Sequence, residues 1–259
     1  MAIAYGENAR TGDYSFSVLL TMTGLPADGG GTRDSSCSGA LIAPRWVITA
    51  GHCFRDRDGR RADRPVAERT IAIIGRTDLQ SREGHEIEVA AVHQADHTDV
   101  ALAELADPVT DITPIQLATA PPTVGEVLRL TGFGVATRGN NIESATWMQT
   151  GLFTVGAIGD TMLEASGRSP SRETSPCPHD SGGPYFREQA GGSPALVAVV
   201  STGPSCPHPG PDFGARVDNL GDWIDSTMSG RPALPWAAIA LLIGAGVLGG
   251  VVVRRRVHR

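Results

Sequence analysis

The 259-residue sequence predicts an all-β body followed by one C-terminal transmembrane helix. Two observations favour many short strands. Glycine and proline are abundant, at 32 and 18 residues, and no apolar stripe with a 3.6-residue period persists before the C-terminal region. A third observation, an uncharged apolar run over residues 236–253, predicts the membrane helix. A hydrophobic content of 41% allows the body a sizeable core.

The charge distribution argues against nucleic acid as a partner. All 22 basic residues are arginine, four of them lie within residues 254–259, and no acidic residue follows Asp225. Without these four, the chain carries 18 basic residues against 28 acidic ones. Because nucleic acid is itself a polyanion, an acidic body repels it.

The four cysteines predict two disulfides and therefore an oxidising compartment. None of them forms a C-x-x-C pair, which disfavours a zinc site, and the sequence alone allows three disulfide pairings. They are Cys37, Cys53, Cys177 and Cys206.

The C-terminal region predicts a single-pass anchor in the cell membrane. Residues 236–253 approach the length that spans a bilayer core, and the basic tail 254–259 indicates a cytoplasmic C-terminus with the body outside. A buried core helix is the alternative, but the run has no polar face. Residues 229–235 form a stalk that, at ~3.3 Å per residue, reaches only ~23 Å from the membrane. The start of the chain resembles no export signal, so we expect that a signal peptide has been trimmed.

Three separated segments contain candidate catalytic residues. The apolar stretch "WVITAGHC" ends beside His52, "HTDVALAEL" places Asp99 at the start of an apolar segment, and "CPHDSGGP" contains Ser181. A serine hydroxyl needs a nearby base to take its proton, and an imidazole can accept that proton and pass it on to the leaving group. A carboxylate on the second ring nitrogen fixes the tautomer of the imidazole. These three residue types predict nucleophilic catalysis.

Two alternatives concern neighbouring residues. Asp96 competes with Asp99 as the orienting acid, although only Asp99 begins the apolar D-V-A-L pattern. His93 and His97 have the i,i+4 spacing of metal ligands but lack the intervening acid of an H-E-x-x-H motif, which disfavours a metal site.

In the order His, Asp, Ser, these segments resemble the trypsin/chymotrypsin-like serine peptidases. With the anchor, the resemblance indicates a bacterial-type, membrane-anchored member that needs no cofactor. It covers residues 3–228 and implies two packed six-stranded antiparallel β-barrels, with a helix near Leu220 to Met228. The segments that carry it are residues 3–9, "CSGALIAPRWVITAGHC", "TGFG" at 131–134, "VVSTG" at 199–203 and "ARVDNLGDWI" at 215–224.

The resemblance assigns the site residues. It pairs Cys37 with Cys53 and Cys177 with Cys206, and it makes His52, Asp99 and Ser181 the catalytic triad. The oxyanion hole consists of the backbone N–H groups of His179 and Ser181. The substrate-binding residues are Ser175 at the pocket floor, Ser201 and Gly203 on the cleft strand, and Asp212 on the last pocket wall.

The resemblance also implies a zymogen. In this family, proteolysis frees an N-terminal amine that pairs with the acid before the nucleophile, and the partners here are Ile3 and Asp180. Because Met1 and Ala2 precede Ile3, the chain as given is the unactivated form. We expect an activating protease to cleave after Ala2 and thereby order the oxyanion hole and the pocket.

His179 departs from the family pattern, which has glycine two residues before the nucleophile. Its backbone N–H remains available, but its side chain restricts the backbone and crowds the leaving-group side of the cleft. Three outcomes are open: a tolerated substitution that narrows specificity, a direct substrate contact, or impaired catalysis, since losing one oxyanion donor costs ~10²–10³ in rate.

The pocket allows more than one preference for P1, the substrate residue before the cleaved bond. Ser175 at the floor favours apolar or aromatic P1 residues. Asp212, if it points inward, relocates the negative charge to the wall and favours Arg or Lys, while Gly203 keeps the entrance open. Small P1 residues are a third preference. The alternative to an inward-pointing Asp212 is that this residue is exposed in the loop "PHPGPDFG".

These observations predict a serine endopeptidase that hydrolyses protein or peptide substrates through an acyl-enzyme outside the cell membrane. A catalytically impaired, membrane-tethered binding module with the protease fold is the alternative, and an esterase is a third reading, because the same triad cleaves esters. The predicted parts of the chain are start residues 1–2, a peptidase domain at 3–228, the stalk at 229–235, the span at 236–253 and the cytoplasmic tail at 254–259.

Overall fold

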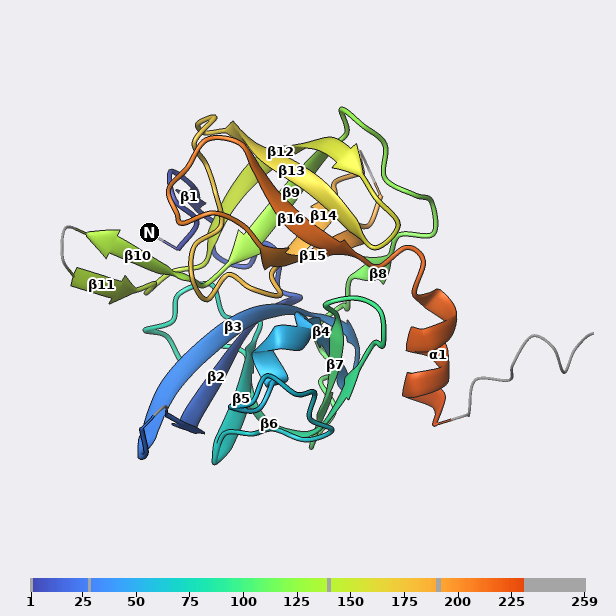
Figure 1. Cartoon of the computed structure of the whole chain (residues 1–259). Helices are drawn as coiled ribbons and strands as arrows, with labels where there is room; N and C mark the ends of the chain where they lie inside the picture. The colour runs from blue at the N-terminus through green and yellow to red at the C-terminus, as the bar shows by residue number, and fades with distance from the viewer. Residues whose placement is uncertain (1, 28, 139–140, 190–191, 231–259) are drawn as a thin grey trace, which may run out of the picture. The chain divides into compact units, whose positions relative to one another are not determined.

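The computed structural model describes residues 2–27, 29–138, 141–189 and 192–230, and two six-stranded antiparallel β-barrels form the body (Figure 1). This confirms the predicted all-β body. Short strands joined by glycine-rich and proline-rich turns are typical of antiparallel β-barrels.

The first barrel is a closed sheet with the strand order β2-β3-β4-β7-β6-β5 (blue to green in Figure 1). Alternating side chains of its strands face inward, and the core includes Val18, Leu20 and Leu102, which are fully buried. The strands are β2 (Ser17–Pro26), β3 (Thr32–Ala43), β4 (Trp46–Thr49), β5 (Arg69–Ile74), β6 (His85–Gln94) and β7 (Ala101–Leu105).

The second barrel follows the order β12-β13-β16-β15-β14-β9, and pairing between β9 and β12 closes it. Its core includes Phe153 and Tyr185, whose rings meet edge to face with centroids 5.3 Å apart. The strands are β9 (Val127–Gly132), β12 (Gln149–Ile158), β13 (Met162–Ser169), β14 (Pro184–Arg187), β15 (Ala195–Thr202) and β16 (Pro211–Arg216).

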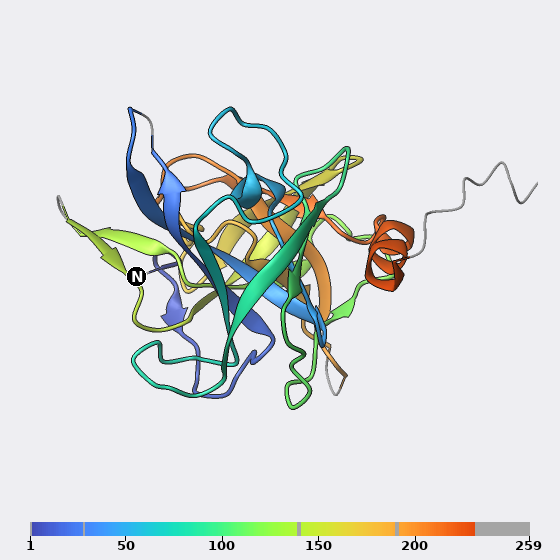
Figure 2. The ribbon, with the colours of Figure 1, turned by 90° about the horizontal axis from the view of Figure 1, so that it is seen from below.

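Short elements supplement the barrels. β1 (Glu7–Asn8) adds to β12, β8 (Gln116–Leu117) runs parallel to β15, and β10 (Val135–Arg138) pairs with β11 (Asn141–Ser144). The 3-10 helix η1 (Gly51–Phe54) follows β4, and Figure 2 shows it beside the loop that leads on to β5.

The C-terminal helix α1 (Gly221–Ser229) begins and ends one residue later than predicted. Among the described residues, no helix is both long and apolar enough to cross a bilayer. The predicted span at 236–253, most of the stalk and the tail lie outside the described residues.

The barrels meet where the predicted site residues lie. The Ser17 and Thr131 hydroxyls are 2.7 Å apart, and the N–H of Phe133 donates to Ser38 Oγ at 3.0 Å. The N–H of Ser38 in turn donates to the carbonyl of Ser181 at 2.8 Å. Strand β3 of the first barrel is therefore bonded directly to the turn that contains Ser181.

Candidate active site

His52 lies on the single turn η1, directly after the buried strand β4. A disulfide between Cys37 and Cys53 ties this turn to β3. A Cβ at Gly51 would lie 3.2 Å from Asp99 Oδ1, so glycine here lets the Asp99 carboxylate approach the turn. The glycine at position 51 and the Cys37–Cys53 disulfide therefore hold His52 next to Asp99.

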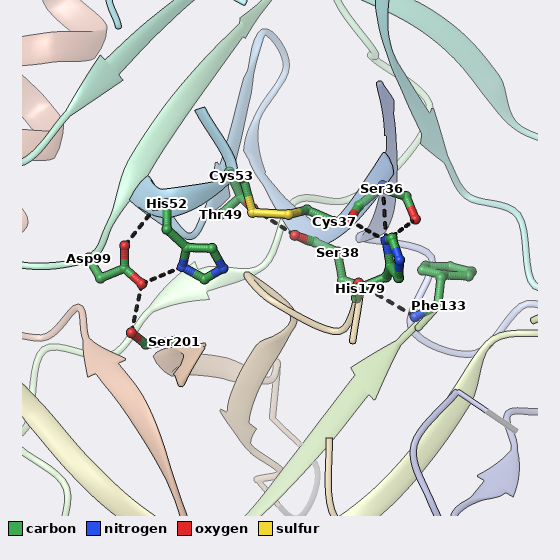
Figure 3. Close-up of a disulfide and its surroundings, with 10 residues drawn as sticks. All are labelled: Ser36, Cys37, Ser38, Thr49, His52, Cys53, Asp99, Phe133, His179 and Ser201. Carbon is green, nitrogen blue, oxygen red and sulfur yellow. Dashed lines mark hydrogen bonds and ion pairs between the residues drawn. A yellow bond between two sulfur atoms is a disulfide. The ribbon is translucent and has the colours of Figure 1, made fainter. Parts of the chain in front are cut away.

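Asp99 accepts three hydrogen bonds (Figure 3). Its Oδ2 is 2.7 Å from His52 Nδ1 and accepts from the Ser201 hydroxyl at 2.6 Å, while its Oδ1 accepts from the His52 N–H at 2.8 Å. Burial alone would raise the pKa of Asp99, but the bonds from His52 and Ser201 outweigh it and hold the pKa below its ordinary value. An ionised Asp99 keeps the proton on Nδ1, which leaves Nε2 of His52 as the basic nitrogen.

Ser181 lies on a tight turn that only glycine can continue. Gly182 has φ +81°, and a Cβ there would lie 2.0 Å from Thr49 Oγ1 and 2.3 Å from the Ser38 carbonyl. Ser181 is half-buried and lines the same cavity as Ser201. The hydrogen bonds of the described residues include none between Ser181 Oγ and His52, and such bonds often tighten only when substrate is bound.

His179 has a left-handed backbone with φ +76°, the conformation that glycine adopts without strain. Its ring turns towards β3, where Nδ1 lies 3.0 Å from the N of Ser36, 2.9 Å from its Oγ and 2.8 Å from its carbonyl oxygen (Figure 3). The Ser38 hydroxyl donates to the His179 carbonyl at 3.1 Å. Side chain and backbone of His179 are thus both held by the first barrel.

The segment 177–183 leaves two N–H groups for a ligand. Those of Cys177, Asp180, Gly182 and Gly183 bond within the protein, whereas those of His179 and Ser181 have no acceptor among the described residues.

Asp180 is fully buried, and both of its carboxylate oxygens accept backbone N–H groups. Oδ1 accepts from Gly134 at 2.8 Å and Oδ2 from Cys177 at 2.9 Å. Burial raises the pKa of Asp180 to about 7, and the two N–H groups oppose that rise. Ile3 is also fully buried, and the adjacent Ala4 pairs antiparallel with Ser175. Among the described residues, no hydrogen bond joins Ile3 itself to Asp180, and their pairing stays a prediction.

A cavity of about 380 Å³ adjoins Ser181, and Ser201, Gly203 and Asp212 line it. Asp212 therefore points inward, and Gly203 lies directly against it, since a Cβ there would be 2.1 Å from Asp212 Oδ1. Ser175, predicted as the floor, is fully buried outside the lining and accepts the N–H of His208 at 3.3 Å. Among the described residues that line this cavity, Asp212 is thus the one with an acidic or basic side chain, and burial raises its pKa to about 6.

Other predictions have clear outcomes. The disulfides Cys37–Cys53 and Cys177–Cys206 both form as the resemblance implies. Asp96 is exposed and pairs with Arg61 rather than with His52.

Comparison with known proteins places the chain in a family. The trypsin family model matches residues 3–224, which is more than half of the chain. The chain belongs to the trypsin family. Membership supports serine endopeptidase activity.

Individual relatives of this trypsin-family chain are distant. It is 27% identical to mouse serine protease 56, with 89% of this chain and 39% of that protein aligned, and 27% identical to human kallikrein-11, with 74% and 71% aligned. The chain thus spans well under half the length of the mouse relative. The solved structure of neuropsin, a serine protease expressed in the limbic system of mouse brain, matches with a TM-score of 0.66 and 23% identity. That match covers 86% of this chain and 98% of neuropsin and shows the same fold.

Three residues of the site were not predicted from the sequence. Ser36 and Ser38 contact His179, and His208 contacts Asp212. The i,i+4 spacing of His208 and Asp212 within "PHPGPDFG" was the available signal for the second contact.

Proposed function

We propose that this protein is a serine endopeptidase in which Ser181 is the nucleophile, His52 the general base and Asp99 the orienting acid. The observation that carries the proposal is the 2.7 Å contact between His52 Nδ1 and Asp99 Oδ2, with Asp99 held further by Ser201. His52 Nε2 takes the proton of Ser181 as Oγ attacks the scissile carbonyl, and later returns a proton to the leaving amine. Water then cleaves the acyl-enzyme by the same route.

The backbone N–H groups of His179 and Ser181 stabilise the oxyanion of each tetrahedral intermediate. This role is supported by the lack of a protein acceptor for either N–H group among the described residues. The Ser38 hydroxyl donates to the His179 carbonyl and so anchors the backbone between the two donors. The His179 ring occupies the leaving-group side and narrows the choice of residues after the scissile bond.

The side chain before the scissile bond enters the cavity beside Ser181. Asp212 on its wall favours Arg or Lys. Ser175, which is uncharged and buried outside the lining, would by itself favour apolar residues. We rank Arg or Lys first because a buried carboxylate gains more from a cation than from an apolar group.

Cleavage after Ala2 activates the enzyme. The freed amine of Ile3 pairs with Asp180, the fully buried carboxyl just before the nucleophile. The antiparallel bridge between Ala4 and Ser175 supports this step, because it aligns the start of the chain with the nucleophile segment.

The enzyme acts at the outer surface of the cell membrane, anchored through residues 236–253 with residues 254–259 on the cytoplasmic side. The uncharged run and the arginines that follow it support this placement.

A fluorophosphonate probe tests the activity, because it labels only a serine activated by a neighbouring base. The protein should be compared before and after a cleavable leader is removed directly in front of Ile3. We expect stronger labelling after removal, complete loss in Ser181→Ala, and no change in Ser229→Ala, an exposed serine at the end of α1.

The second candidate is a binding module with impaired catalysis, and the left-handed backbone of His179 is the observation that favours it. Folded protein that stays unlabelled in both forms would establish this candidate over the first.

A further inference from the structure

His208 is buried in the loop between Cys206 and β16, where it contacts Asp212 on the wall of the proposed specificity cavity. Its side chain is 9% exposed, and its Nε2 lies 3.1 Å from Asp212 Oδ1. Its backbone N–H donates to Ser175 Oγ, so the loop is attached to the position predicted as the pocket floor. The proposed cation-binding carboxyl therefore already has a partner within the protein.

Both ring nitrogens of His208 face oxygen atoms that accept hydrogen bonds. Nε2 faces the Asp212 carboxyl, and Nδ1 lies 3.2 Å from the carbonyl oxygen of Pro209. A carbonyl only accepts, so this contact is a hydrogen bond only when Nδ1 carries a proton. The contact at Nε2 then needs one more proton, either on Nε2 beside an ionised Asp212 or on Asp212 itself. In both arrangements, the pair has a net charge of zero.

Asp212 has one oxygen left for a ligand. Its Oδ2 is buried and has no hydrogen-bond partner among the described residues. Its Oδ1 contacts Nε2 of His208 and lies close to the backbone of Gly203. A buried acceptor without a partner is costly, and a guanidinium or ammonium group in the cavity would satisfy it.

We propose that His208 and Asp212 form a proton-gated counter-ion: the pocket binds a cationic P1 side chain tightly only after the pair releases one proton. The inference rests on the proposed endopeptidase function and names a determinant of its specificity. With the shared proton present, the pair is neutral and the pocket favours uncharged P1 groups. Once His208 is neutral and Asp212 ionised, the wall has one net negative charge that attracts Arg or Lys.

Other charged groups surround the pair. Inside the barrel these are the carboxyl of Asp180 and the phenol of Tyr185, both fully buried. Burial, with the two carboxylates, raises the pKa of Tyr185 well above its ordinary value, so the phenol stays neutral. On the solvent side, Arg168 and Arg172 line a different cavity together with Pro209. Within the described part of the chain, the test must therefore separate the proton of Asp180 from that of the pair.

We expect the preference for Arg over Phe at P1 to depend on pH. The ratio of kcat/KM for Arg against Phe at P1 should rise by up to about tenfold per pH unit while the pair loses its proton, and then level off. Since both substrates share the triad and Asp180, the ratio cancels the titration of those groups.

Calorimetry with benzamidine, a small aromatic cation, tests whether cation binding requires the loss of this proton, and it does not depend on catalysis. Binding should be measured across pH in phosphate and in Tris, because buffers with different ionisation enthalpies reveal the protons released. Wild-type protein should release close to one proton per benzamidine below the midpoint of the pair and none well above it. No proton release at any pH, or no binding of benzamidine at all, would overturn the proposal.

Two variants test whether the released proton comes from the His208–Asp212 pair. In His208→Gln the release should move to lower pH, because the imidazole no longer helps to hold the shared proton. One pH unit below the wild-type midpoint, this variant should bind benzamidine about tenfold more tightly than wild type. His85→Gln is the matched control, since His85 forms a similar pair with Asp111 at 2.8 Å on the first barrel, and it should match wild type.

The outcomes separate the two proposals. An unchanged proton-release profile in folded His208→Gln contradicts the gate even if Ser181 reacts with the fluorophosphonate. If His208→Gln does not fold, the two-buffer measurement on wild-type protein still decides. Failure of the proposed activity would appear as absent labelling of Ser181, which does not depend on benzamidine.

Discussion

Substitution of His179 separates the strain of its backbone from the contacts of its ring. At φ +76° a residue with a Cβ loses roughly 1–2 kcal/mol relative to glycine. Nδ1 of the ring accepts from the N–H and hydroxyl of Ser36 in one tautomer and donates to the Ser36 carbonyl in the other, and each such bond stabilises by about 1 kcal/mol. The two effects nearly offset each other in the wild-type chain.

His179→Ala keeps the Cβ but removes the ring contacts to Ser36, so we expect the free energy of unfolding to fall by about 1–2 kcal/mol. His179→Gly removes the strain as well, and should be more stable than the alanine variant by roughly 1–2 kcal/mol. Urea denaturation of the three proteins measures these differences.

The same variants report on the oxyanion hole. Without its contact to Ser36, the strained peptide of His179→Ala can turn its N–H away from the reacting oxygen, and loss of that donor costs up to ~10²–10³ in kcat. Glycine should recover most of this loss. Ser36→Ala, which removes only the hydroxyl contact, is the mild control. Wild-type stability and kcat in His179→Ala would refute this account of the ring.

Three further predictions follow from the proposed site and anchor. Asp99→Asn should lower kcat by about 10⁴ with little change in KM, because the amide no longer fixes the His52 tautomer; steady-state kinetics measures this. Since the folded pKa of Asp180 is about 7, above its unfolded value of ~3.9, the folded state binds more protons between these values. Stability should thus fall by up to ~4 kcal/mol as pH rises from ~4 to ~7, and Asp180→Asn should flatten this slope in denaturation series. A chain ending at Gly230 should leave the membrane pellet, whereas the full chain should stay there.

Sequence reasoning identified the parts of the fold and site that depend on local patterns. The residues around His52 and Ser181 are recognisable because a strand end, a tight glycine turn and a neighbouring cysteine are all encoded within a few positions. The Gly182 turn is an example, because no other residue fits between Thr49 and Ser38.

The remaining features depend on loops and on the direction of single side chains. Ser175 and Asp212 stand 37 positions apart in the chain, and their relation to the cavity is set by how the loop after Cys206 folds. Periodicity carries no information about such a loop. For the same reason, the contact between His179 and Ser36 across two barrels could not be predicted from either segment alone.

The buried charges of the second barrel connect activation with specificity. Two carboxyls, Asp180 and Asp212, lie inside it, and the charge on Asp212 helps to raise the pKa of Asp180. His208 can neutralise only one of them, so the other is most stable when protonated, and Asp180 with a pKa of about 7 is that group. A free amine at Ile3 would supply the second cation and let Asp180 ionise. Cleavage after Ala2 should therefore abolish the stability slope between pH ~4 and ~7, which makes that slope a readout of activation independent of any substrate.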